Sequence, residues 1–118
     1  MSFTNSKEVK IKLWYKKSCI DKQNGLYLGG VQLPKYMKEL KINIDNDEIF
    51  DFDKDQFVQT GKKLIEITGT NRALKELGKF FINISLFKTK DDDFHEHLDD
   101  LTNENGEASC NITIRKQN

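Results

Sequence analysis

The sequence predicts an α+β fold, a single two-layer domain in which one main amphipathic helix covers a mostly antiparallel sheet. Several segments alternate apolar and polar side chains with the period of two that a half-buried strand requires. One segment, about residues 72–87, repeats its apolar side chains with the period of an α-helix. The 118 residues fit one domain, 1–118, and eight Phe, three Tyr and one Trp supply bulky side chains for its core.

The first third of the chain predicts two strands and a short helix. Residues 9–16 alternate apolar side chains with lysines, which predicts a strand with Trp14 on the lysine face. Residues 26–28 predict a short strand, because glycine-containing turns lie on both sides of them. Pro34 is the only proline, and its fixed φ suits the first turn of a short helix near 34–40.

The middle of the chain predicts a hairpin with a polar loop. Residues 42–44 and 49–52 have strand character and flank the polar loop 45–48. Residues 51–55 carry Asp at alternate positions, as a calcium-binding loop does, but they lack the turn glycine and the bidentate glutamate that follow in such a loop. The sequence therefore favours a simple turn there, beside phenylalanines that we expect to be buried.

The main helix follows a further strand. Residues 64–68 are rich in strand-forming residues and end at Gly69, after which Thr70 or Asn71 can accept a capping hydrogen bond. The helix should then place its polar face, which includes Asn83, in water. The apolar side chains expected to face the sheet are Leu74, Leu77, Phe81 and Ile84, with Ala73 and Phe80 beside them.

The last third of the chain holds an acidic, histidine-bearing segment and a closing strand, 110–115. In an extended segment His95, His97 and Asp99 share one face. Two histidines one residue apart suit zinc or iron, but such a site needs further ligands, and the sequence contains no obvious complementary pair. We expect no metal and no cofactor. A small metal-binding module or enzyme built on these three residues is the alternative.

Charged residues cancel over the whole chain but lie in bands. The 19 basic and 19 acidic residues give no overall positive field, so we expect no nucleic-acid partner. The net charge is +6 over residues 1–41, −5 over 42–60, +5 over 61–90 and −6 over 91–118. If folding brings the two acidic bands together, they form an acidic face that steers a basic partner; if not, they are solvated loops.

Other features of the sequence indicate the cellular compartment and whether the protein is an enzyme. The sequence has no secretory signal and no apolar segment long enough to cross a bilayer, so we expect a cytoplasmic protein without a membrane partner. Cys19 and Cys110 are then expected to be free thiols. No common catalytic motif occurs, so the sequence predicts no enzyme and names no catalytic residue. It does not predict the oligomeric state.

Between residues 62 and 116 an ordered set of short motifs resembles a known family. The motifs are Ile65-Glu66-Ile67-Thr68-Gly69, Ala73-Leu74-x-x-Leu77 on the helix, Phe94-His95-x-His97-Leu98-Asp99, Ser109, and Ile112-x-Ile114-Arg115. Together they resemble an immunity-protein family of bacterial polymorphic toxin systems, the family catalogued as immunity protein thirty-two. The first sixty residues lie outside the resemblance. It implies a small cytoplasmic protein that binds and neutralises a cognate toxin domain, without catalysis.

The acidic segment is the candidate contact surface for such a partner. Many toxin domains that attack nucleic acids are basic, so an acidic inhibitor surface would associate fast and occupy the site that holds phosphates. An aromatic side chain, Phe94 or Trp14, would anchor the contact. A generic protein-interaction domain without a toxin partner is a further alternative. The candidate partner-binding residues are Asp91, Asp92, Asp93, Phe94, His95, Glu96, His97, Asp99, Asp100 and Trp14.

Overall fold

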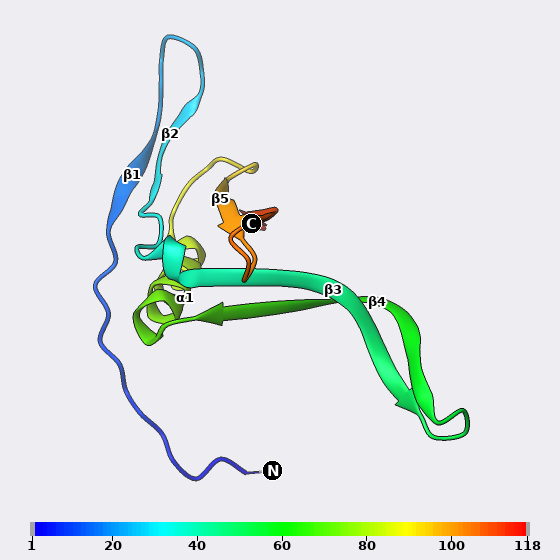
Figure 1. The fold of residues 1–118 in the computed structure, drawn as a ribbon. Helices are drawn as coiled ribbons and strands as arrows, with labels where there is room; N and C mark the ends of the chain where they lie inside the picture. Colours follow the sequence, from blue (N-terminus) through cyan, green and yellow to red (C-terminus); the bar gives the residue numbers. More distant parts are fainter. Residues whose placement is uncertain (1, 118) are drawn as a thin grey trace.

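The computed structural model describes residues 2–117, which form one α-helix and three antiparallel β-hairpins (Figure 1). The elements, in chain order, are β1 (Tyr15–Ile20), β2 (Tyr27–Val31), the 3-10 helix η1 (Met37–Glu39), β3 (Leu40–Asp51), β4 (Gln56–Gly69), α1 (Asn71–Leu86), β5 (His95–Thr102) and β6 (Ala108–Arg115). This confirms the α+β class. The strands pair as β1–β2, β3–β4 and β5–β6, so the antiparallel sheet is divided into three separate ladders.

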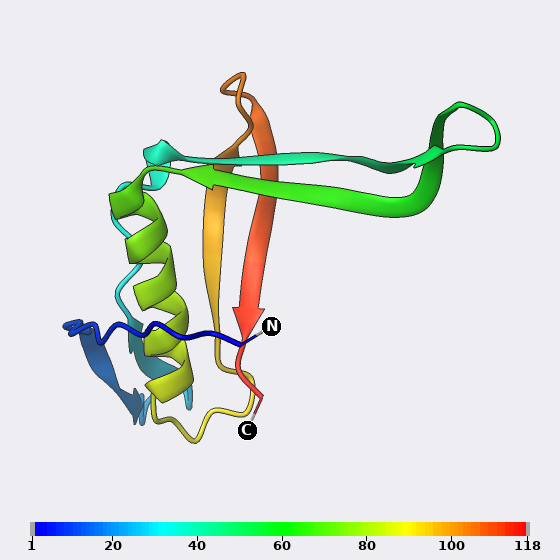
Figure 2. The ribbon, with the colours of Figure 1, turned by 90° about the horizontal axis from the view of Figure 1, so that it is seen from below.

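The core lies where α1 meets the hairpins. Figure 2 shows α1 running alongside β5–β6, with the base of β3–β4 crossing one end of both. Phe80 and Ile84 of α1 pack in one buried cluster with Ile42 of β3 and with Leu98 and Leu101 of β5. The helix and the hairpins thus hold one another by burying a shared apolar surface, which is the main stabilising contribution to the fold.

α1 begins as the sequence predicts but is rotated about its axis. The Thr70 side chain accepts a hydrogen bond from the backbone amide of Ala73 at 3.3 Å, which is the expected cap. The buried stripe contains Ala73 and Phe80, whereas Leu74 and Phe81, which we expected to face inward, are exposed. The prediction for these two residues is wrong.

A long-range hydrogen bond accounts for the rotation. We expected Asn83 on the polar face, but it is buried, and its amide donates to the backbone carbonyl of Trp14 at 2.9 Å. A buried amide needs such a partner, so the face that contains Asn83 is held against the chain around Trp14. The backbone amide of Gln32 donates to the same carbonyl at 3.0 Å and ties this point to the end of β2 as well.

The first forty residues contain less regular structure than expected. The predicted strand over residues 9–16 is wrong for most of its length, because residues 2–14 pair with no strand in the described part of the chain and β1 begins only at Tyr15. The predicted strand at 26–28 overlaps β2, but β2 continues through Gly29 and Gly30, where we expected a turn. The helix expected near 34–40 is reduced to η1, because Tyr36 immediately before it adopts a left-handed conformation with φ 62°.

β3 and β4 form one long arm rather than the short hairpin that we predicted. Residues 45–48, expected as a loop, lie within β3, and the chain turns at 52–55 instead. The turn forms there because the Asp51 carboxylate accepts hydrogen bonds from the backbone amides of Asp53 at 2.9 Å and Lys54 at 3.3 Å. Phe52, which we expected to be buried, is 87% exposed.

The arm gives the molecule an elongated shape. The radius of gyration is 19.0 Å, and the principal extents are 64 × 40 × 29 Å; a compact chain of this length would have a radius of gyration of about 13 Å. A shift in strand register between Asn46 and Glu48, with Gly61 opposite at φ 82°, coincides with the bend visible in both ribbon views. We call the part beyond the bend, residues 48–59, the distal arm.

The base of the arm is held to the body by polar contacts as well as by the core. The Ser109 hydroxyl donates to the carbonyl of Ile42 at 2.6 Å, and the Glu104 amide donates to the Asn43 side chain at 3.1 Å. These partners come from β6 and from the turn before it. Because they fasten the first residues of β3, the rest of the hairpin projects from the body.

Candidate partner-binding surface

The acidic segment lies in β5 and in the turn that precedes it. Phe94 is 8% exposed and stacks on Phe87, with ring centroids 4.7 Å apart. It belongs to the core, which contradicts its expected role as an aromatic anchor for a partner. Leu98 is also buried and lies on the same inward side of the strand.

The opposite face of β5 carries the two histidines. Their rings meet edge to face with centroids 4.7 Å apart, so the prediction that His95 and His97 share a face is confirmed. The Nδ1 atom of His95 lies 2.7 Å from the carbonyl oxygen of Asp93, and that of His97 lies 3.2 Å from the hydroxyl of Thr113. Asp99 follows where β5 begins to shift register. Across residues 2–117, no three His, Cys, Asp or Glu side chains are grouped in a way that could hold a metal ion.

The acidic residues of the segment differ in their surroundings. Asp93 forms an ion pair with Arg115 of β6, and its backbone amide donates to the Asp91 carboxylate at 2.9 Å. Asp99 and Asp100 are exposed at the register shift, where Asp100 has a φ of 60°. Asp92 is exposed and Asp91 is half-buried. The exposed acidic groups are therefore spread along the whole length of β5 and its preceding turn.

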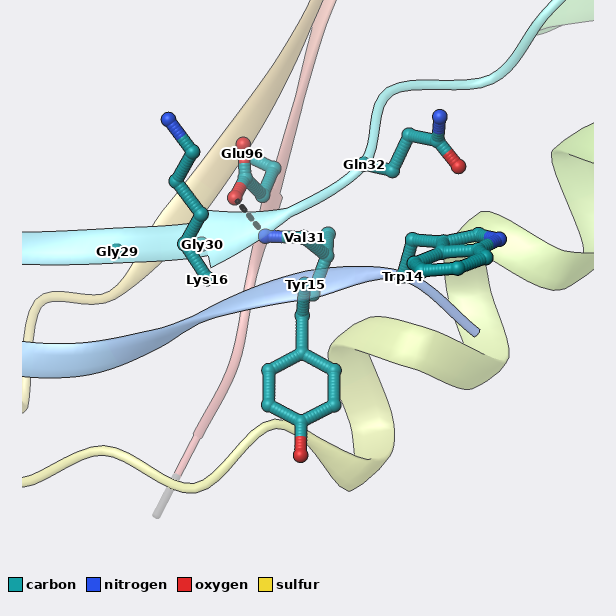
Figure 3. A pocket seen from close by; sticks show the side chains of 8 residues that line it. All are labelled: Trp14, Tyr15, Lys16, Gly29, Gly30, Val31, Gln32 and Glu96. Atoms are coloured by element: carbon teal, nitrogen blue, oxygen red, sulfur yellow. Dashed lines mark hydrogen bonds between the residues drawn. The ribbon is translucent and has the colours of Figure 1, made fainter. Parts of the chain in front are cut away.

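Trp14 and Glu96, which are far apart in sequence, border the same hollow (Figure 3). The hollow is open and has a volume of about 480 Å³. Trp14 is 55% exposed, and the ammonium group of Lys12 lies 4.5 Å from the centre of its ring. The lining residues are Trp14, Tyr15, Lys16, Gly29, Gly30, Val31, Gln32 and Glu96.

Glu96 links two strands across this hollow. Figure 3 shows its side chain reaching from β5 to β2, where the carboxylate accepts a hydrogen bond from the amide of Val31 at 3.1 Å. A Cβ atom at Gly30 would lie 2.6 Å from that carboxylate, so a larger residue there would displace the end of the Glu96 side chain. Glu96 thus joins two hairpins, and its neighbour across the hollow, Trp14, is the more accessible of the two candidate residues.

Acidic residues of the two acidic bands of the sequence approach each other at the base of the arm. Asp45 of the band 42–60 and Glu104 of the band 91–118 border a polar hollow of about 340 Å³ there, together with Glu66 from the basic band 61–90. The distal arm carries further acidic residues and projects away from β5 in both ribbon views. Folding therefore separates most of the negative charge into two regions, one on the distal arm and one along β5.

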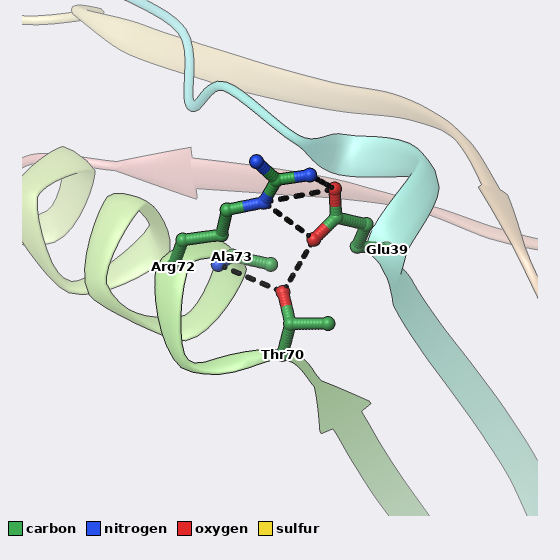
Figure 4. Close-up of polar contacts among 4 residues, drawn as sticks. All are labelled: Glu39, Thr70, Arg72 and Ala73. Carbon is green, nitrogen blue, oxygen red and sulfur yellow. Dashed lines mark hydrogen bonds and ion pairs between the residues drawn. The ribbon is translucent and has the colours of Figure 1, made fainter.

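A polar cluster fixes the start of α1 to η1 (Figure 4). The Glu39 carboxylate accepts hydrogen bonds from Arg72, at 2.9 Å from Nε and 2.5 Å from Nη2, and from the Thr70 hydroxyl at 2.6 Å. Arg72 in turn lies over the ring of Tyr36, 4.1 Å from its centre. The hydrogen bonds from Arg72 and then Thr70 lower the pKa of Glu39 from 4.5 to about 2, and the bond to Glu39 raises the pKa of Arg72.

The distal arm is an exposed surface that the sequence reasoning missed. Phe50 contacts Phe52 and Phe57 edge to face, with centroids 5.0 and 5.3 Å apart. Phe52 and Phe57 are themselves exposed, and so is Ile49 beside them. The signal in the sequence was the alternation of large apolar and acidic residues through Ile49–Asp55, which we interpreted as a strand end with buried phenylalanines.

Comparisons with protein-family models, with curated proteins and with solved structures found no match for this chain. In the described residues no helix combines the length and the apolar character needed to cross a membrane. The immunity-protein resemblance therefore stays a prediction from the sequence.

Proposed function

We propose that this protein acts by binding another protein, and that its partner is a cognate toxin domain, which it neutralises in the cytoplasm. The observation that carries the proposal is the exposed Trp14, which borders one hollow with Glu96 of β5. A partly exposed tryptophan at the edge of a hollow is the kind of side chain that supplies much of the binding energy in protein interfaces. Glu96 is the acidic residue that lines this hollow, and the exposed acidic groups elsewhere along β5 would attract a basic partner before contact.

The identity of the partner class comes from the resemblance over residues 62–116. A toxin domain that attacks nucleic acids needs a basic site for phosphates, and the acidic groups along β5 have the charge to occupy it. Trp14 lies outside the stretch that carries the resemblance. Its backbone is nevertheless fastened to α1 through the hydrogen bond from Asn83, so the anchor and the acidic strand belong to one framework.

The first test uses the full chain and the toxin domain encoded by the neighbouring gene. Co-expression should protect cells from the toxin, and the purified proteins should form a complex. Trp14→Ala should raise the dissociation constant about thirtyfold, the effect of losing about 2 kcal/mol at an interface centre. Phe3→Ala removes another exposed aromatic side chain, which does not line the hollow, and should leave binding unchanged.

A charge variant tests whether the acidic groups speed association through long-range electrostatic attraction. Asp99→Lys should slow association at low ionic strength, and the difference from wild type should shrink as salt is added. Glu8→Lys makes the same change in net charge in the N-terminal segment and is the matched control. If Asp99→Lys and Trp14→Ala both bind and protect like wild type, the proposed surface is wrong. If the neighbouring gene encodes no toxin and no complex forms, the proposed function fails.

A further inference from the structure

The tip of the distal arm combines exposed aromatic side chains with negative charge. Phe52, at the turn, is 87% exposed, and Phe57 and Ile49 are exposed beside it. Around them the distal arm carries four acidic residues, Glu48, Asp51, Asp53 and Asp55, and one basic residue, Lys54. Exposure of large apolar side chains to water is unfavourable, so a partner that covers them would gain binding free energy.

The arm is ordered in a way that suits docking. The Phe50 ring supports both Phe52 and Phe57 through edge-to-face contacts, so the tip is a packed aromatic cluster. The turn below it is fastened by the two hydrogen bonds to the Asp51 carboxylate. A pre-organised tip loses little conformational entropy when it binds.

A hollow with the complementary character lies at the other end of the molecule. It has a volume of about 530 Å³ and lies between the β1–β2 hairpin and the segment that follows α1. Ile20 and Tyr27 supply apolar surface, and the exposed Lys88 and Lys90 supply positive charge. A hydrogen bond of 2.8 Å between the hydroxyls of Ser18 and Thr89 joins the two walls. We call this the basic hollow.

The tip and the basic hollow cannot meet within one chain. Figures 1 and 2 both place the tip at one extreme of the molecule and the β1–β2 hairpin, with the segment after α1, on the far side of the body. The base of the arm is fastened to β5–β6, which fixes this separation. The charges nevertheless match, since residues 42–60 carry −5, whereas residues 1–41 and 61–90 carry +6 and +5.

We propose that the occupant of the basic hollow is the distal arm of a second copy of this chain, and that the protein assembles with itself through this contact. Phe52 packs against Ile20 and Tyr27, which lie opposite each other on β1 and β2, and the acidic side chains around it face Lys88 and Lys90. One hairpin tip in one hollow covers less than the roughly 1,600 Å² of a standard interface. A symmetric dimer, in which each arm docks on the other copy, makes the contact twice and closes the assembly.

The assembly is tested on the purified full chain alone, so its outcome does not depend on the toxin proposal. Sedimentation equilibrium at low ionic strength should show a dimer that weakens as salt is added, because charged groups lie around the contact. Phe52→Ala should raise the dimer dissociation constant at least tenfold, as loss of a central aromatic anchor does. Phe3→Ala is the matched control, because Phe3 is 90% exposed and lies in the N-terminal segment, and it should leave the dimer unchanged.

Charge reversal identifies the two surfaces. Asp53→Lys on the arm and the double variant Lys88→Glu/Lys90→Glu in the basic hollow should each weaken the dimer at least tenfold, and mixing the two variants should restore association between them. All substituted side chains are exposed, so circular dichroism should show unchanged folding. A wild-type chain that stays monomeric up to roughly 100 μM, well above the micromolar range of weak complexes, would overturn the proposal. Variants that dimerise like wild type, or a mixture that fails to associate, would overturn it as well.

Discussion

Truncation of two adjacent phenylalanines tests which face of α1 is buried. Phe80 is 2% exposed and lies in the core cluster, whereas Phe81, the next residue along the chain, is 45% exposed. The hydrophobic period of the sequence alone favours Phe81 as the inward residue, so the two variants decide between the periodicity and the structure. The pair shares the same residue type, the same helix and the same local propensity, which removes most other differences.

The expected magnitudes follow from the burial of each ring. Phe80→Ala removes a buried ring and leaves a cavity, which costs about 3–5 kcal/mol in the free energy of unfolding. Phe81→Ala removes a ring that is nearly half exposed and leaves no enclosed cavity, so we expect about 1 kcal/mol or less. A domain of this size has a total stability of about 5–15 kcal/mol, so the first loss is a large share of it.

The assay is urea unfolding followed by circular dichroism, with the slope of the transition compared between variants. If Phe80→Ala does not fold, Phe80→Leu provides a smaller truncation, which should still cost more than Phe81→Ala. A larger loss for Phe81→Ala than for either Phe80 variant would refute the helix orientation and, with it, the burial of Asn83.

Three further outcomes follow from single contacts. In native protein Cys19, which is exposed on β1, should react quickly with a thiol reagent, whereas Cys110, which packs against the core, should react mainly after unfolding. If neither cysteine reacts in unfolded protein kept without reductant, the two form a disulfide. Glu39→Gln should lower the melting temperature above pH 4.5, because the charged carboxylate bonded to Arg72 stabilises the fold there. Since the pKa of Glu39 is about 2, the difference from wild type should fall as the pH drops from 4.5 and vanish below about 2. A difference in melting temperature that does not depend on pH would contradict this. Asn83→Ala leaves a backbone carbonyl of the N-terminal segment without this donor and should cost about 1–3 kcal/mol in urea unfolding, whereas an effect near zero would mean that the bond does not hold the segment.

The sequence predicted those elements whose cause is local. Thr70 caps α1 as expected, because a cap needs only a side-chain oxygen within one turn of a helix. The strand at 110–115 and the shared face of His95 and His97 follow from the alternation of side chains along an extended chain. For the candidate surface, Trp14 is exposed as expected, although the strand that would have placed it on a lysine face does not form at that residue.

The predictions from the sequence are wrong where contacts between distant segments decide the structure. The sequence predicts Phe94 as one of two candidate surface anchors, but Phe87 across the loop stacks on it and draws it into the core. The residues 45–48 have the composition of a loop, but pairing with β4 keeps the chain in a strand on both sides of the shift in register between Asn46 and Glu48. A polar segment on a two-stranded arm has water on both faces, so its composition does not separate a strand from a loop.

The sequence by itself determined the α+β class, the position of the main helix and its cap, and the strongly banded charge, because these depend on neighbours within a few residues. Only the tertiary structure decided which face of α1 is buried, how far the arm projects, and that Trp14 and Glu96 border one hollow. These depend on contacts between residues far apart in the chain, such as the hydrogen bond from Asn83 to Trp14, and no local pattern in the sequence specifies which distant groups will meet.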